Sequence, residues 1–168
     1  MRQTFFGSAL VCLAACGGKP QTCTVALSGA QTGTYDCSPA VLAWASSVDT
    51  FNFGLQAPSS FGLEFPRSGD PQLSVGLKFR GEPQPTTYTD ATVGAEGSVS
   101  VEGSAGSWRT YTGNQLGSIT LKFTRISNPL AVGVGKGYGF VGTLDATLPS
   151  RTNTATTVTL HATFNGVP

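Results

Sequence analysis

Three cysteines near the start of this chain are the clearest candidates for covalent chemistry, which for a thiol means acylation or a disulfide. Cys16 directly follows Ala14 and Ala15 at the end of an apolar stretch. Small residues at those two positions suit the narrow site of a signal peptidase, and the thiol beside them can carry a diacylglyceryl group. Cys23 and Cys37 remain as a pair that an oxidising compartment would convert to a disulfide.

The first 15 residues have the pattern of an export signal. Residues 1–4 carry a single positive charge at Arg2, and an apolar stretch follows from Phe5 to Ala15. That stretch has the length of a signal h-region and is shorter than the roughly 18 residues of a membrane span. We expect residues 1–15 to be removed, which leaves Cys16 as the first residue and residues 16–22 as a short lipidated tether.

The segment Leu13-Ala14-Ala15-Cys16 resembles the lipobox of bacterial lipoproteins. The resemblance implies acylation (palmitate) on Cys16 and attachment to a lipid bilayer through those acyl chains. The residue after the cysteine is Gly17 and not the aspartate that would keep a lipoprotein from being passed on. If the host has two membranes, the resemblance therefore implies transfer to the outer membrane. The alternative is an ordinary secretory signal cut near Ala15, with Cys16 merely nearby, and it would also export the chain.

The residues between Cys23 and Cys37 predict a hairpin. Residues 24–27 and 34–36 have strand composition, and residues 28–33 between them are rich in turn formers. An antiparallel pairing centred near Ala30 places the two cysteines opposite each other. A metal or redox site is the alternative, but it lacks a Cys-x-x-Cys spacing and clustered histidines. We therefore predict a structural disulfide.

Apolar residues alternate with polar ones along most of the remaining chain, which is the period of a β-strand with one buried face. The clearest alternating positions are Leu73, Val75, Leu77 and Phe79; Ile119, Leu121 and Phe123; Leu144, Ala146 and Leu148; and Val158, Leu160, Ala162 and Phe164. Clusters of Gly, Pro, Asn and Ser separate these runs. The pattern predicts an all-β fold in one domain, residues 23–168, built as an antiparallel β-sandwich or, alternatively, a partly closed barrel.

We expect little helix. Only Pro39 to Ala45 could form a helical turn or two, with Ser38 as the N-cap and Pro39 at the first helical position. An irregular crossover is the alternative for this segment.

The charge balance limits the classes of partner. Loss of Arg2 with the signal leaves nine of the ten Lys and Arg residues against nine Asp and Glu, and both signs are scattered along the chain. A nearly neutral domain without basic clusters is not typical of a nucleic-acid-binding protein.

No motif predicts catalysis. His161 is the only histidine and falls on the polar face of the last predicted strand, so a Ser-His-Asp arrangement would depend on it alone. The run from Gly137 to Gly142 matches Gly-x-Gly-x-x-Gly, but a strand follows it where a dinucleotide fold needs a helix. We interpret it as a glycine-rich turn. We predict no catalytic residue, no metal and no cofactor.

Trp108 and Tyr111 are the candidate ligand-binding residues. Trp108 lies among small polar residues, which favours exposure, and exposed aromatic rings of β-sandwich modules stack on sugars. Packing in the core is nevertheless the preferred interpretation of Trp108, and a ligand role is the alternative. Trp44 lies among alanines and a valine, which favours the core.

The lipobox, the segment between Cys23 and Cys37, and the predicted hairpin segment 142–149 together resemble small β-rich bacterial lipoproteins of myxobacterial type. This resemblance implies an envelope location and an all-β fold, and it implies no activity.

From the sequence we expect a non-enzymatic lipoprotein that is anchored to the cell envelope and has a structural or protein-interaction role. Its expected partners are the bilayer, through acylated Cys16, and an envelope protein, with no nucleic acid. The alternative is a tethered module that binds a glycan or small ligand. A hydrolase would need carboxylates that converge in a cleft.

Overall fold

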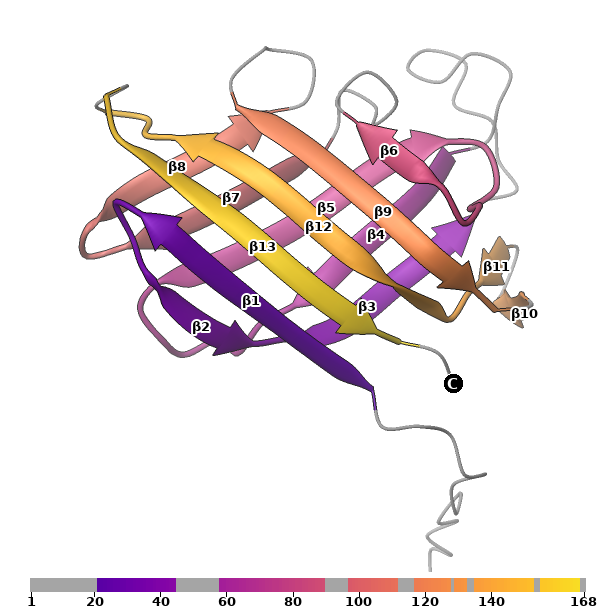
Figure 1. Ribbon diagram of the computed structural model, residues 1–168. Helices are drawn as coiled ribbons and strands as arrows, with labels where there is room; N and C mark the ends of the chain where they lie inside the picture. Colours follow the sequence, from indigo (N-terminus) through magenta and orange to yellow (C-terminus); the bar gives the residue numbers. More distant parts are fainter. Residues whose placement is uncertain are drawn as a thin grey trace, which may run out of the picture.

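The computed structural model describes residues 21–44, 58–89, 97–111, 117–127, 129–132, 135–152 and 155–166. Every regular element in these ranges is a β-strand, and the strands form two antiparallel sheets that face each other (Figure 1). The sheets do not close into a barrel. The predicted all-β, antiparallel sandwich is therefore confirmed, and its partly closed barrel alternative is not.

Sheet A, the near layer in Figure 1, contains the N-terminal hairpin and the C-terminal strand. Its strand order is β2 (Gly33–Asp36), β1 (Thr22–Gly29), β13 (Thr157–Asn165), β12 (Phe140–Pro149), β9 (Ser118–Ile126) and β6 (Thr87–Thr89).

Sheet B lies behind sheet A, and its strands cross those of sheet A in the view of Figure 1. Its order is β10 (Leu130–Val132), β11 (Gly135–Gly137), β3 (Ser38–Trp44), β4 (Pro58–Glu64), β5 (Gln72–Arg80), β7 (Ser98–Gly103) and β8 (Gly106–Tyr111).

The predicted alternation accounts for the core between the sheets. In β13 the residues Val158, Leu160, Ala162 and Phe164 are at most 3% exposed, while the residues between them are exposed. Phe61 of β4 reaches across to three phenylalanines of sheet A at ring-centroid distances of 5.2–5.6 Å: Phe123, Phe140 and Phe164. Edge-to-face aromatic contacts of this kind add to the stability that apolar burial gives.

The segment from Ser38 to Trp44 is a strand, so the predicted helical turn is wrong there. β3 pairs with β4, and Leu42 is 2% exposed opposite Phe61. The register shifts between Pro39 and Val41, where a bulge accommodates the proline. A local capping pattern predicted a helix here, but burial of Leu42 in a paired strand outweighs that weak preference.

The glycine-rich run from Gly137 to Gly142 leads from the end of β11 into β12. Only residues 138–139 form the connection that was predicted as a turn, and Phe140 to Gly142 already belong to β12. Gly142 has a specific packing role because a Cβ atom there would overlap the backbone oxygen of Lys122 on β9. The pairing of β12 with β9 also shifts register between Val141 and Gly142. A residue without a side chain is therefore required where these two strands meet.

Candidate functional site

Cys16 and the whole predicted signal segment lie outside the described residues, so lipidation stays a prediction. The described chain begins at Gln21, one residue before β1. Within the ranges given above, no helix has the length and apolar character needed to cross a membrane.

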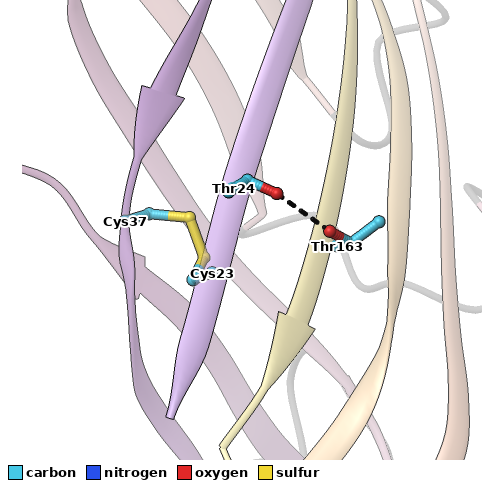
Figure 2. The surroundings of a disulfide bond; sticks show 4 residues. All are labelled: Cys23, Thr24, Cys37 and Thr163. Carbon is cyan, nitrogen blue, oxygen red and sulfur yellow. Dashed lines mark hydrogen bonds between the residues drawn. A yellow bond between two sulfur atoms is a disulfide. The ribbon is translucent and has the colours of Figure 1, made fainter. Parts of the chain in front are cut away.

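The predicted disulfide between Cys23 and Cys37 is present and joins β1 to the end of β2 (Figure 2). The register pairs Thr24 with Asp36, which makes the hairpin symmetric about Ala30. The amide of Cys37 donates a hydrogen bond to the carbonyl of Cys23 at 3.0 Å, and the two Cα atoms lie 4.8 Å apart. Cys23 is 6% exposed, so this bridge is part of the packed structure.

Trp108 is buried, with 3% of its surface exposed, so the preferred interpretation, packing in the core, is confirmed, and the exposure that its polar neighbours favoured is not observed. Its strand, β8, is an edge strand of sheet B, but the chain after β12 covers that edge. Ser150 forms a β-bridge with Trp108, and the amide of Arg151 donates to the carbonyl of Ser107 at 3.1 Å. The Trp108 side chain itself belongs to the core cluster together with Val101, its partner in register, so it presents no face for stacking on a sugar.

The second candidate, Tyr111, is the last residue of β8. Only its backbone belongs to the described part of the chain, and its side chain does not. Trp44, expected in the core, is only half-buried.

The outer face of sheet A contains a depression that no single stretch of sequence predicts. Each of four neighbouring strands contributes one residue to each of two rows that run across it. The register aligns Ala26, His161, Asp145 and Thr120 in the first row. The adjacent row consists of Ser28, Thr159, Thr147 and Ser118. These two rows line an open hollow of about 320 Å³, which we call the sheet A depression.

His161 is exposed, as expected, and it has a partner that the sequence analysis missed. Its Nδ1 lies 2.6 Å from Oδ1 of Asp145, and both side chains are more than half exposed. Because the hydrogen bond to the carboxylate occupies Nδ1, Nε2 is the ring nitrogen that can contact a ligand. Counting outward from the turn of the β12–β13 hairpin would have aligned these two residues, since both occupy polar positions of an alternating strand.

A second polar cluster lies beside Trp44, the last residue of β3, and includes Lys136 of β11. Lys136 Nζ is 2.9 Å from Glu82 Oε1 and lies 5.2 Å from the ring centroid of Trp44. The hydroxyl of Tyr138 donates to the same oxygen of Glu82. Hydrogen bonds lower the pKa of Glu82, the one from Tyr138 more than the one from Lys136. The pKa of Tyr138 is raised, mainly by burial and also by its hydrogen bond to Glu82.

This second cluster has a structural explanation. Lys136 pairs with Trp44 in register, so it projects on the same side of sheet B as the core residues. β10 and β11 form the short edge of that sheet. Lys136 thus lies on the strand next to the edge strand β10, and the carboxylate of Glu82 compensates its charge.

No group of three or more His, Cys, Asp or Glu side chains that could hold a metal ion occurs in the described part. Comparisons with protein-family models, curated proteins and solved structures found no match to this chain.

Proposed function

We propose that this chain is an exported lipoprotein, anchored in the cell envelope through acylated Cys16, and that it has a structural or protein-contact role without catalysis. In a host with two membranes the proposed location is the outer membrane. The single observation that carries the proposal is the Cys23–Cys37 disulfide, seven residues beyond the predicted lipid-bearing cysteine.

The disulfide supports export because such bonds persist in oxidising compartments and are rare in the cytosol. It also supports a domain that begins close to the anchor. β1 starts at Thr22, and the chain from Cys16 to Thr22 spans at most about 20 Å when fully extended. The proposed anchor would therefore hold sheet A and sheet B near the bilayer surface.

Lipidation supplies enough attachment for this arrangement. Each buried methylene of an acyl chain contributes about 0.8 kcal/mol, so one chain binds reversibly while two or more hold a domain stably.

Membrane fractionation tests the anchor. We expect the Cys16→Ala variant to move from the membrane to the soluble fraction, while the matched Cys12→Ala variant, whose thiol lies within the predicted signal, behaves as the unaltered chain. Retention of Cys16→Ala in the membrane fraction would contradict the lipoprotein proposal.

A pull-down of the tagged full-length protein from native membranes in mild detergent tests the contact role. A stoichiometric envelope protein, identified by mass spectrometry, is the expected result.

The second candidate function is a tethered module that binds a glycan or small ligand. Burial of Trp108 removes the residue that the sequence favoured for it. The sheet A depression, with its exposed Asp145–His161 pair, is the observation that now favours this candidate.

A further inference from the structure

We propose that the sheet A depression is a binding site for a neutral, polyhydroxylated ligand, that is, an uncharged glycan chain. This inference rests on the second candidate function and assigns its site and ligand class.

The shape of the depression follows from the side chains in its two rows. Three small residues lie on the first and last of the four strands: Ala26 and Ser28 on β1, and Ser118 on β9. Between them, His161 projects from β13 and Asp145 from β12. The side chains of the floor residues Leu27, Ala146 and Leu160 are buried in the core. The hollow faces solvent, since most of its lining side chains are exposed: Ala26, Ser28, Ser118, Asp145, Thr159 and His161.

The lining excludes two ligand classes. Among the described residues, the lining contains no Lys or Arg, which phosphate or another anion would require, and its one carboxylate, Asp145, opposes an anionic ligand. The exposed side chains of the described lining include no Phe, Tyr, Trp or large aliphatic group, so burial of apolar surface provides little affinity for an apolar ligand or a hydrophobic protein patch.

The remaining chemistry matches a sugar. Five hydroxyl side chains line the depression, and each can both donate and accept a hydrogen bond. Asp145 adds a carboxylate acceptor, and His161 adds its second ring nitrogen. Two of the hydroxyls, those of Ser28 and Thr159, lie 2.5 Å apart and hold each other in position. Sugar hydroxyls also donate and accept, so they can satisfy this set without bringing charge.

The experiment uses the full-length chain in mild detergent and follows the imidazole NMR signals of His161. These signals are unique because the chain has one histidine. The probes are the neutral oligosaccharides maltotetraose, cellotetraose and chitotetraose, with tetragalacturonate as the charged comparison. We expect a saturable shift with at least one neutral oligosaccharide and none with tetragalacturonate.

Two variants on one strand provide a matched comparison. Thr159 lies in the depression and pairs with Ser28, whereas Thr163 lies outside it and pairs with Thr24 at 3.0 Å (Figure 2). We expect Thr159→Val to weaken binding about three- to tenfold, the range of one lost hydrogen bond, and Thr163→Val to leave it unchanged. Ala26→Phe, which fills the space beside His161, should abolish binding.

The inference is overturned if no neutral oligosaccharide shifts the His161 signals, if tetragalacturonate binds equally well, or if Thr163→Val weakens binding as much as Thr159→Val. Loss of an envelope protein partner in Ala26→Phe, without any oligosaccharide binding, would identify the face as a protein-docking surface and would also overturn it. The Cys16→Ala fractionation reports on the anchor independently of all these outcomes.

Discussion

Asp145 and His161 face each other directly across β12 and β13, with Oδ1 and Nδ1 2.6 Å apart on the outer face of sheet A. Both side chains are more than half exposed, so water competes for each of them. We therefore expect Asp145→Asn to lower the free energy of unfolding by less than about 1 kcal/mol at neutral pH. Urea denaturation measures this value, and a loss above about 2 kcal/mol would mean that the pair has a structural role after all.

Removal of the disulfide should weaken the fold markedly. In the chain-entropy model a loop of this length stabilises by about 3 kcal/mol, and Cys23–Cys37 also ties edge strand β2 to β1. We expect the double variant Cys23→Ala/Cys37→Ala to lose about that much in urea denaturation. Reduction of the unaltered chain should produce the same loss, and the double variant should not respond to the reductant. An unchanged stability after reduction would contradict the prediction.

Trp108 should behave as a core residue. Because it is 3% exposed, we expect Trp108→Ala to cost about 3–5 kcal/mol in thermal or urea unfolding. Its Nε1 has no hydrogen-bond partner within the described residues. Trp108→Phe should therefore cost clearly less, since it keeps an aromatic ring and removes the unpartnered donor. Equal losses for the two variants would show that the indole nitrogen matters.

Gly142 should tolerate no side chain. A Cβ there would overlap the Lys122 carbonyl oxygen, so we expect Gly142→Ala to cost about 1–3 kcal/mol of unfolding free energy. Gly76, also in a strand, has nothing within 4 Å of the corresponding position, and Gly76→Ala is the matched control. Comparable losses in the two variants would refute the steric argument.

Stability should fall in acid partly through Glu82. Tyr138 and Lys136 hold the pKa of this carboxyl below its usual range, so its ionised form is favoured in the folded chain. The stabilisation is present above the unfolded-state pKa of about 4.3 and is lost as the pH falls through the lower, folded-state pKa.

The variant Glu82→Gln tests this pH dependence. Its melting temperature should lie below that of the unaltered chain near neutral pH and converge with it in strong acid. Tyr138→Phe, which removes the main hydrogen-bond donor to Glu82, should show a similar but smaller change. A constant gap between Glu82→Gln and the unaltered chain at every pH would assign the loss to packing instead.

The fold class was predictable because the signal for a strand is local. In β13 and β9 alternate residues face the core, so the period of two in the sequence reappears directly as burial. The hairpin between Cys23 and Cys37 was predictable for a similar reason. Its turn residues and its two cysteines lie within a short segment, and symmetry about Ala30 sets the register.

Other features depended on segments far apart in the chain. β3 is a strand because β4 and β11 pair with its two edges, whereas its own residues suggested a helical turn or an irregular crossover. Trp108 is buried because the side of β8 that carries it faces the core, where it lies with Val101 of β7. Its neighbours in sequence are small and polar, and they indicated the opposite.

By itself, the sequence determined which residues form most of the strands, which side of each strand is apolar, and which cysteines can pair, since these properties depend on nearest neighbours along the chain. Three features follow only from the tertiary structure: the order of the strands, the pairing of Ser150 with Trp108 on the edge of β8, and the two rows of side chains that line the sheet A depression. The physical reason is that burial of an edge residue and alignment of four strands depend on long-range pairing, which no local periodicity encodes.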